Sequence, residues 1–389
     1  MEGDFIKINK WLLPLSWLYG AGVKLRNTMF SIGILKSRAF DVPVISVGNI
    51  TVGGTGKTPH VEYLVEMMKK QFRVAVLSRG YKRKSKGFVM ADADTPMEAI
   101  GDEPYQMKQK FPDVTVAVDK NRCHGIDVLT ANDRQLDAIL LDDAYQHRYV
   151  KPGINILLVD YHRLVIYDKL LPAGRLREPL SGKDRADIVI VTKCPKDMKP
   201  MEFRVITKAM DLYPYQQLYF TTLVYGDLRP ILSDRTATVS ISELQNRHVM
   251  VLSGIASPEQ MIHDLTPHCS HLVPLTFSDH HDFTPKDVRL INDTFAAMPS
   301  PKCIMTTEKD AARLQSVAGL DDEVCANIYA LPVSIRFMQD QQDNFNNQIT
   351  GYVHKNSRNS ILAKAKDAHQ SDNSNHSGDR PRTISFRNY

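Results

Sequence analysis

The chain of 389 residues contains only five cysteines, and no two of them have C-x-x-C spacing. This scatter argues against a disulfide framework and a structural zinc site, and it is typical of a protein in a reducing cytoplasm. The sequence is also short of long apolar runs. The uncharged stretch Trp11–Val23 falls well below the roughly 20 residues that a helix needs to span a bilayer. No small-residue cleavage pattern follows a basic start, so a secretory signal is not expected.

Positive charge is scarce in the middle of the chain, although the formal net charge is +5. Residues 1–40 carry six Lys and Arg against two acids, and residues 353–389 carry seven against three, which leaves 41–352 slightly acidic. A core of this kind is not that of a nucleic-acid-binding protein, so no nucleic acid is expected as a partner. The two basic ends either favour an anionic membrane surface or are simply solvated.

The first 40 residues combine an apolar stretch with flanking cations. Trp11, Trp17 and Tyr19 lie among aliphatic residues, with lysine and arginine on both sides. This pattern suits a helix that lies in the membrane interface, where aromatic rings meet lipid headgroups. The alternative is an amphipathic helix packed on the protein core. We expect 1–40 to be an N-terminal membrane-associating helical segment.

From residue 41 onward, short apolar stretches alternate with helical patterns, which indicates mainly parallel sheets covered by helices. Ligands in such α/β folds bind at the carboxyl ends of the strands. The expected strands are 42–47, 73–77, 114–118, 138–141, 154–159, 188–192, 248–252, 272–275 and 303–306.

The strands form two groups, so we expect two α/β/α domains, a larger one over 41–228 and a smaller one over 229–352. Residues 353–389 are rich in Asn, Ser, His, Lys and Arg and have few apolar residues. Such a composition buries too little surface to fold alone, and we expect a basic, disordered tail.

The strongest local signal is the sequence VISVGNITVGGTGKTP at residues 44–59. A strand leads into glycines and then into Gly-Lys-Thr at a helix start, as in a P-loop, where backbone N–H groups and the helix dipole bind phosphate. Lys57 would reach the β- and γ-phosphates, and the Thr58 hydroxyl would hold Mg²⁺. The larger domain, 41–228, is therefore expected to resemble a P-loop NTPase. The predicted nucleotide-binding residues are Thr51, Val52, Gly53, Gly54, Thr55, Gly56, Lys57 and Thr58, with Thr51 where the strict pattern has Gly.

A second signal is AILLDDAYQH at residues 138–147, an apolar strand that ends in two acids. A carboxylate at this place in a P-loop protein holds Mg²⁺ directly or through water, which makes Asp142 and Asp143 the candidates. The alternative is an acidic turn at a strand end.

Two further acidic motifs are Gly101-Asp102-Glu103-Pro104 and the segment 279–282, which reads Asp-His-His-Asp. Acids before a proline suit a helix N-terminus as caps, but Asp102 could also accept a hydroxyl proton as a base. The histidine pair lacks further metal ligands nearby and could instead orient or tune a carboxylate, unless it is a polar surface turn.

Arginines in three further segments are candidates for gripping phosphate by paired N–H donors. Each of them is otherwise an ordinary solvated cation. They are Arg175 and Arg177 in LLPAGRLREPL, Arg79 in SRGY, and Arg122 in VDKNRCHG.

Together these segments resemble the tetraacyldisaccharide 4′-kinase (lipid A 4′-kinase) family. That family shows VGNxxVGGxGKTP, SRGY, GDEP, DDGxQH, PxGxLREP and DHHxF. This chain has VGNITVGGTGKTP, SRGY, GDEP, DDAYQH, PAGRLREP and DHHDF in the same order, over roughly residues 10–335. One departure is Ala144, where the family usually has Gly, and this small change is expected to be tolerated unless the position needs a positive φ.

The resemblance implies ATP-dependent phosphorylation of the 4′-hydroxyl of a tetraacyl disaccharide 1-phosphate to the 1,4′-bisphosphate, a step of lipid A biosynthesis. It implies ATP and Mg²⁺ as cofactors, and the lipid substrate and a membrane surface as partners. The enzyme would be a two-domain kinase bound peripherally to the cytoplasmic face of the bacterial inner membrane. No obligate protein partner is evident.

The resemblance also implies roles for single residues. Lys57 and Asp102 would be catalytic, with Asp102 as the base paired with His280 across the domain cleft. His280 is preferred over His281 because it directly follows the aspartate. Thr58, Asp142 and Asp143 would serve Mg²⁺. The residues expected to line the site are Arg79, Glu103, Arg122, Gln146, Arg177 and Glu178.

Two other classes of function fit part of the sequence. A nucleotide-switch or assembly ATPase would share the P-loop and the strand-end acids, but Asp102, His280 and the apolar N-terminus fit a lipid kinase better. A non-catalytic membrane-binding module would leave the P-loop unexplained.

Overall fold

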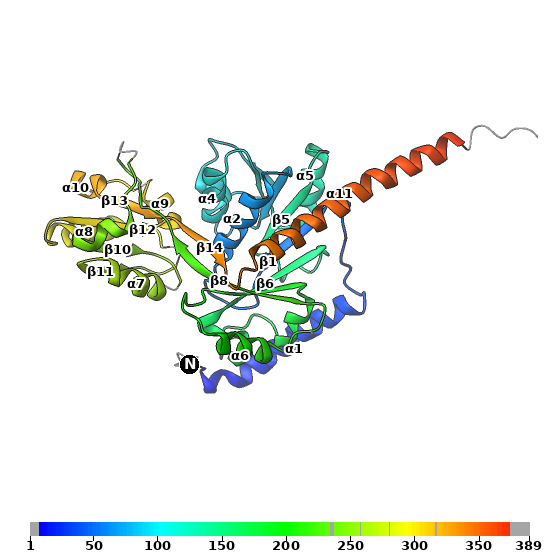
Figure 1. Cartoon of the computed structure of the whole chain (residues 1–389), viewed down its shortest axis with the longest axis horizontal. Coiled ribbons are helices and arrows are strands. Elements are labelled where there is room, and N and C mark those ends of the chain that lie inside the picture. Colours follow the sequence, from blue (N-terminus) through cyan, green and yellow to red (C-terminus); the bar gives the residue numbers. More distant parts are fainter. Residues whose placement is uncertain (1–7, 234–236, 257, 280, 316, 374–389) are drawn as a thin grey trace, which may run out of the picture.

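The computed structural model describes residues 8–233, 237–256, 258–279, 281–315 and 317–373, and of residues 358–373 the helical backbone alone. The described chain forms two sheets, a large one and a small one, each covered by helices (Figure 1). The expected α/β fold with mainly parallel sheets is confirmed.

The large sheet has nine strands in the order β14-β8-β7-β6-β1-β5-β2-β4-β3. Only the edge strands β14 and β3 run antiparallel to their neighbours, and the other pairs are parallel. The strands are β1 (Val44–Gly48), β2 (Val74–Ser78), β3 (Val89–Ala91), β4 (Thr115–Val118), β5 (Ala138–Asp142), β6 (Ile154–Asp160), β7 (Ile188–Thr192), β8 (Gln217–Tyr225) and β14 (Val333–Phe337).

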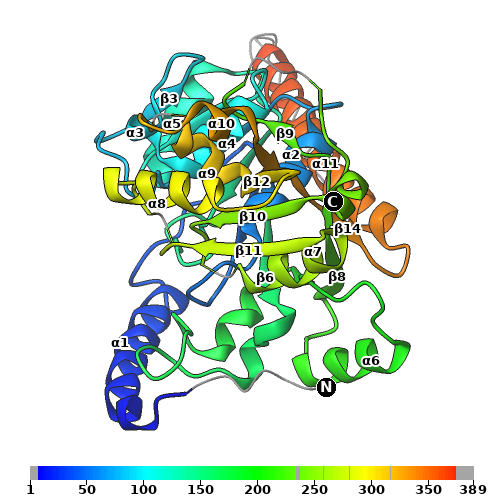
Figure 2. The same ribbon diagram turned by 90° about the vertical axis from the view of Figure 1, so that its left-hand side faces the viewer.

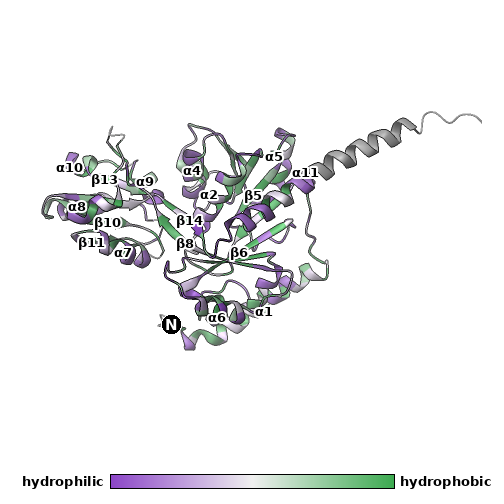
Figure 3. Ribbon diagram, viewed as in Figure 1, coloured by the Kyte–Doolittle hydropathy of each residue, from purple (hydrophilic) through white to green (hydrophobic). Residues whose placement is uncertain are grey.

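Helices cover both faces of this sheet, which explains why its central strands are apolar at nearly every position. One face packs against α2 (Lys57–Met68), α4 (Asp102–Lys110) and the start of α11 (Gln342–Asn373). The other face packs against α5 (Arg122–Asn132) and α6 (Pro200–Met210). Figure 3 shows the apolar residues concentrated in the strands between these layers. The short α3 (Met97–Ile100) precedes α4.

The small sheet has the order β11-β10-β12-β13-β9, parallel except for β9. Figure 2 shows it in front of the large sheet. Its strands are β9 (Arg229–Pro230), β10 (His248–Ser253), β11 (His271–Thr276), β12 (Lys302–Thr307) and β13 (Ile328–Leu331). Its helices are α7 (Glu259–Leu265), α8 (Pro285–Ala296), α9 (Glu308–Leu314) and α10 (Asp322–Ala326).

Local sequence explains where these helices begin. The Thr284 side chain accepts a hydrogen bond from the backbone N–H of Asp287, and Pro285 stands at the first helical position of α8. The Thr307 side chain caps α9 in the same way through Asp310. Both are side-chain caps that satisfy N–H groups left without partners in the first turn.

After the small sheet the chain returns to the large one, which differs from the expected second domain over 229–352. Strand β14 pairs with β8, and Phe345, Ile349 and Val353 of α11 are buried in the core of the large sheet. These side chains recur every four residues, so they form one apolar face of the helix. The small sheet therefore ends at Leu331.

The first part of the expected disordered tail also differs, because α11 continues as a helix to Asn373 (Figure 1). Once the packed first turns have nucleated a helix, each further residue adds a hydrogen bond at little cost. The composition of residues 353–389 indicates that they cannot form a core of their own. It carries no signal that the helix starting at Gln342 continues into them.

Helix α1 (Leu13–Ser31) lies at the lower edge of the molecule, on the same side as α6 (Figure 2). The Ser16 hydroxyl donates to the Leu170 carbonyl (3.0 Å), and the Tyr19 hydroxyl donates to the Arg177 carbonyl (2.7 Å). Trp11, before the helix, is 93% exposed, and Leu18 is 73% exposed. Within the described residues, every helix is too short or too polar to cross a membrane.

We expect Phe345→Ala to lower the free energy of unfolding by about 3–5 kcal/mol, because it leaves a cavity in the core of the large sheet. Phe345 is fully buried against Tyr63, Tyr219 and Phe337. Urea denaturation measures the effect, with Lys355→Ala on the exposed side of α11 as the control. Equal stability of the two variants would show that α11 does not belong to this core.

Candidate active site

A cleft of about 1310 Å³ lies between the two sheets, at the carboxyl ends of the strands of the large one. Its walls come from both parts of the chain and from α1. The lining includes residues 52–59, Ser78, Arg79, Tyr81, Glu103, Asp143, Gln146, Arg175, Arg177, Glu178 and Lys193 from the large sheet, and 255–256, 258–261, 276–279 and 307–309 from the small one. Helix α1 adds Tyr19, Val23, Arg26 and Asn27.

The P-loop connects β1 to α2 and forms the floor of the cleft. Gly53 and Gly56 have φ of 116° and 76°, which L side chains rarely adopt, and this explains the glycines. The Asn49 amide donates to the Thr55 hydroxyl (2.9 Å), and the Thr192 hydroxyl donates to the Thr55 carbonyl (3.0 Å). These bonds fix the loop, and residues 52–58, up to the start of α2, line the cleft. Of the predicted loop residues, only Thr51 is buried away from it.

The imidazole of His60 holds α2 in place beneath the loop. Its Nδ1 lies 2.7 Å from the Gly56 carbonyl oxygen, and its Nε2 lies 3.0 Å from the hydroxyl of Thr221 on β8. Burial lowers the pKa of His60 to about 4, so the ring is neutral at physiological pH.

The strand-end acids lie beside the P-loop because β5 is the parallel neighbour of β1, with Val47 opposite Asp142. Asp142 is buried, and the Ser78 hydroxyl donates to its Oδ2 (3.3 Å). Burial, together with the carboxylates of Glu103 and Asp143, raises the pKa of Asp142 to about 7. Lys57 and Arg122 oppose this rise only in part, and a further cation beside Asp142 would lower its pKa, because it would favour the ionised carboxylate.

Asp143 follows with a left-handed backbone, at φ 46°, and its side chain points into the cleft. Its carboxylate lies 3.6 Å from Lys57 Nζ and 3.7 Å from the Arg177 guanidinium. Burial alone would raise the pKa of Asp143, but the two cations outweigh burial and lower it.

The chain departs from the family motif at Ala144, and the structure accommodates this residue. The positive φ belongs to Asp143, and Ala144 is not among the residues with a left-handed backbone. Its methyl group is buried in the apolar cluster formed with Leu141 and Val150. Position 144 therefore does not need the positive φ that would make alanine unfavourable.

Asp102 and Glu103 stand at the start of α4, as their motif predicts. Gly101 before them has φ 91°, and a Cβ there would lie 2.7 Å from the Tyr81 carbonyl oxygen. Glu103 lines the cleft, whereas Asp102 forms an ion pair with Arg313 of α9. Asp102 is thus the point where the helix of the large sheet meets the helix of the small one.

The partner that the resemblance gives to Asp102, His280, lies outside the described residues, so their pairing stays a prediction. The neighbouring His281 turns elsewhere. Its Nε2 lies 3.0 Å from Oδ2 of Asp287, at the start of α8, and its ring stacks on Phe277.

Residues 170–180, which we call the arginine-rich loop, run along the P-loop. The N–H of Val52 donates to the Arg175 carbonyl, and the N–H of Arg177 donates to the Ile50 carbonyl, both at 2.8 Å. This pairing brings the side chains of Arg175 and Arg177 to the cleft.

Gln146 and Glu178 join this loop to the strand end of β5. The Gln146 amide donates to the Asn49 carbonyl (2.6 Å) and to Glu178 (3.3 Å). Glu178 is buried and also pairs with Arg185 (3.0 Å) and with the Asn27 amide of α1 (3.3 Å). Both predicted residues line the cleft.

The last two predicted arginines differ in position. Arg79 lines the cleft, whereas Arg122 is buried under the strand ends and donates to the carbonyls of Asp119 (3.3 Å) and Asp142 (3.4 Å). Burial lowers the pKa of Arg122 to about 10, which leaves it charged at neutral pH.

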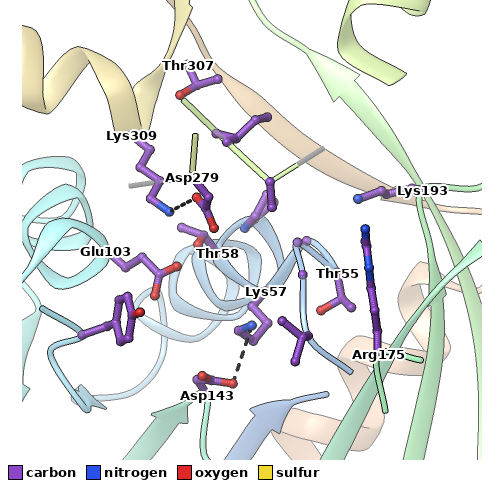
Figure 4. A pocket seen from close by; sticks show the side chains of 18 of the residues that line it. Thr55, Lys57, Thr58, Glu103, Asp143, Arg175, Lys193, Asp279, Thr307 and Lys309 are labelled. Atoms are coloured by element: carbon purple, nitrogen blue, oxygen red, sulfur yellow. Dashed lines mark hydrogen bonds and ion pairs between the residues drawn. The ribbon is translucent and has the colours of Figure 1, made fainter. Parts of the chain in front are cut away.

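The cleft residues that were not predicted from the sequence include Lys193, Thr307 and Lys309. Figure 4 shows Lys309 paired with Asp279 above Glu103, and Lys193 beside Arg175 on the opposite side of the loop. The distance from Lys309 Nζ to Asp279 Oδ1 is 3.3 Å. Lys193 directly follows β7, Thr307 is the last residue of β12, and Lys309 lies in the first turn of α9. The rule that ligands bind at strand ends would have found them.

This combination defines the class of the protein. A strand–loop–helix with Gly-Lys-Thr at the centre of a parallel sheet, acids on the neighbouring strand end and a cationic cleft above them are the parts of a P-loop phosphotransferase or NTPase.

Comparison with known proteins identifies the family. The model of the tetraacyldisaccharide-1-P 4′-kinase family matches residues 8–354. The chain is similar to the tetraacyldisaccharide 4′-kinases of Phocaeicola vulgatus (60% identity over 92% of this chain and 99% of that protein) and Bacteroides fragilis (54%, over 95% and 100%). It is also similar to the crystal structure of LpxK from Aquifex aeolicus in complex with ATP (TM-score 0.66, 31% identity, 88% and 98% of the two chains).

The chain belongs to the tetraacyldisaccharide-1-P 4′-kinase family. The predicted family and the prediction of an ATP-dependent kinase are thereby confirmed.

We expect Gly56→Ala to weaken ATP binding about tenfold, because a left-handed backbone costs an L residue roughly 1–2 kcal/mol. A Cβ at Gly56 meets only His60 at 3.7 Å, so the effect would come from backbone strain and not from a clash. Calorimetric titration with ATP measures it. Ala144→Gly is the control and should bind ATP like the wild type. Weaker binding by that control would mean that Ala144 itself shapes the site.

Proposed function

We propose that this chain transfers the γ-phosphoryl group of ATP to the 4′-hydroxyl of a tetraacyl disaccharide 1-phosphate, and that the cleft between the two sheets is its active site. Family membership supports the reaction. The observation that carries the site is the arrangement of Lys57, Asp143 and Glu103 around one cleft, with Asp102 adjacent to Glu103 and paired with Arg313. A phosphate donor, a cation and a proton acceptor can meet there.

The P-loop binds the phosphates of ATP. The N–H groups of the loop and the positive end of the α2 dipole would offset the negative charge, and the Lys57 ammonium would reach the β- and γ-phosphates. Arg177, held next to Lys57 by Asp143, adds a second cation that can grip a phosphate oxygen.

Thr58, Asp142 and Asp143 are the residues that would hold Mg²⁺. They fit this ion, because Oδ1 of Asp143 is buried without a hydrogen bond and the pKa of Asp142 stays raised although Lys57 and Arg122 lower it. No cluster of three His, Cys, Asp or Glu occurs in the described part of the chain, but Mg²⁺ draws most of its ligands from phosphate and water. The ion would neutralise charge on the β- and γ-phosphates.

Asp102 is the general base. Its carboxylate accepts the proton of the 4′-hydroxyl while the hydroxyl oxygen bonds to the γ-phosphorus, the bond from that phosphorus to the bridging oxygen breaks, and ADP leaves. Arg313 orients the carboxylate from the side of α9. His280 is assigned the role of its second partner, and Arg79, Glu103, Arg122, Gln146 and Glu178 shape the site around it.

Helix α1 carries the cleft to a membrane surface. The side of the helix that faces the protein contacts the arginine-rich loop through Tyr19 and Asn27, and its other side exposes Trp17 and Leu18. Aromatic and aliphatic side chains with nearby cations suit the membrane interface. Acyl chains of the substrate would stay in the bilayer, at the cytoplasmic face of the inner membrane, while the headgroup reaches the cleft.

We expect Asp102→Asn to lower phosphorylation of the lipid by a factor of about 100 to 10,000, because the amide cannot accept the proton. ATP binding should be retained. Transfer of label from ATP to a tetraacyl disaccharide 1-phosphate in mixed micelles measures the loss, with the exposed Asp113→Asn as the control. ATP hydrolysis by the wild type without labelled lipid would instead favour the switch ATPase.

We expect the double change Trp17→Glu and Leu18→Glu to weaken binding to anionic vesicles by at least about tenfold, because each side chain contributes roughly 1.5–3 kcal/mol when buried. Co-sedimentation with vesicles measures binding. Leu290→Glu is the matched control, since Leu290 is an exposed leucine of α8 on the small sheet. Unchanged vesicle binding would contradict the role of α1.

A further inference from the structure

A partly buried group of three charged side chains connects the two halves of the cleft. Lys110, the last residue of α4, places its Nζ 2.7 Å from Oε2 of Glu62 on α2 and 3.1 Å from Oε2 of Glu308 on α9. The Gln106 amide donates to the other oxygen of Glu62 (2.8 Å). We call Glu62, Lys110 and Glu308 the three-helix ion cluster.

Each helix of this cluster carries a part of the active site. Helix α2 begins with Lys57 and Thr58, and α4 begins with Asp102 and Glu103. Helix α9 follows the cleft residue Thr307 and bears Arg313, the ion-pair partner of Asp102. Lys110 is thus a single cation that touches the phosphate-binding helix, the helix of the base and the helix of the small sheet.

Lys110 supplies the positive charge of the cluster. Two carboxylates, Glu62 from the large sheet and Glu308 from the small one, share one ammonium. Removing the cation would leave two like charges facing each other where α2 approaches α9, and uncompensated buried charge is strongly unfavourable. The repulsion would push the helices of the two sheets apart, and so would tend to open the cleft between them.

We propose that Lys110 is a positioning residue for phosphoryl transfer, which holds α9 and α4 over the P-loop helix so that Asp102 faces the bound ATP. This inference rests on the proposed function of Asp102. Lys110 does not itself line the cleft, whereas Glu62, Gln106 and Glu308 do.

The pH dependence of the cluster distinguishes positioning from simple stabilisation. Burial raises the pKa of Glu62 to about 7, the Glu308 carboxylate adds to the shift, and Lys110 and Gln106 oppose it. Glu62 is therefore mostly neutral below pH 7 and ionised above it. Without Lys110 its pKa would be higher still, so the repulsion would set in at a more alkaline pH.

The test measures kcat and the KM for ATP of the full-length protein between pH 6 and pH 9, in mixed micelles with a tetraacyl disaccharide 1-phosphate. For Lys110→Met we expect kcat to fall about tenfold at the alkaline end and less at pH 6, with little change in the KM for ATP. Lys110→Arg should restore most of the activity. Lys70→Met, an exposed lysine just after α2, is the control.

Adding Glu308→Gln to Lys110→Met should recover part of the lost kcat, because it removes one of the two facing carboxylates. A cluster with only a structural role would lower the melting temperature of Lys110→Met and leave its kcat and pH profile as in the wild type, and this would overturn the inference. Absence of lipid phosphorylation by the wild type would overturn the proposed function itself.

Discussion

Parallel hydrogen bonding between β1 and β5 sets Val47 opposite Asp142, so the P-loop and the strand-end acids leave the sheet at the same edge. The site depends on this register, because it brings Lys57 within 3.6 Å of Asp143 although the two residues belong to different β–α units. Strand β6 on the other side of β1 and the loop after it then supply the arginines. The proposed phosphate site is therefore a consequence of sheet order.

The second half of the cleft depends on contacts between helices. Helix α4 presents Asp102 at its first turn and Lys110 at its last, and both pair with residues of α9. A helix held at both ends by opposite charges has a defined position relative to the small sheet. Two chain segments connect the sheets, one from β8 to β9 and the other from β13 to β14. They run side by side, since the Gly226 N–H donates to the Pro332 carbonyl (2.9 Å).

Helix α1 has one side that contacts the protein and another that is exposed. Its hydrogen bonds to Leu170 and Arg177 tie it to the loop beside the P-loop, while Trp17 and Leu18 stay exposed. If α1 contacts the membrane as proposed, its place beside the arginine-rich loop would keep the distance from the lipid surface to the P-loop short, as a kinase with a lipid acceptor requires.

The sequence by itself determined the α/β class, the P-loop at 51–58, the strand-end acids and the family, because these depend on local patterns of apolar residues and glycines. It did not determine that β14 and α11 return to the large sheet, since strand pairing is a long-range contact. Asp102 and Arg313 are 211 positions apart, and Lys110 and Glu308 are 198 apart. Only the packing of α9 against α4 decided those pairs, because a lone arginine or lysine carries no local signal for its partner.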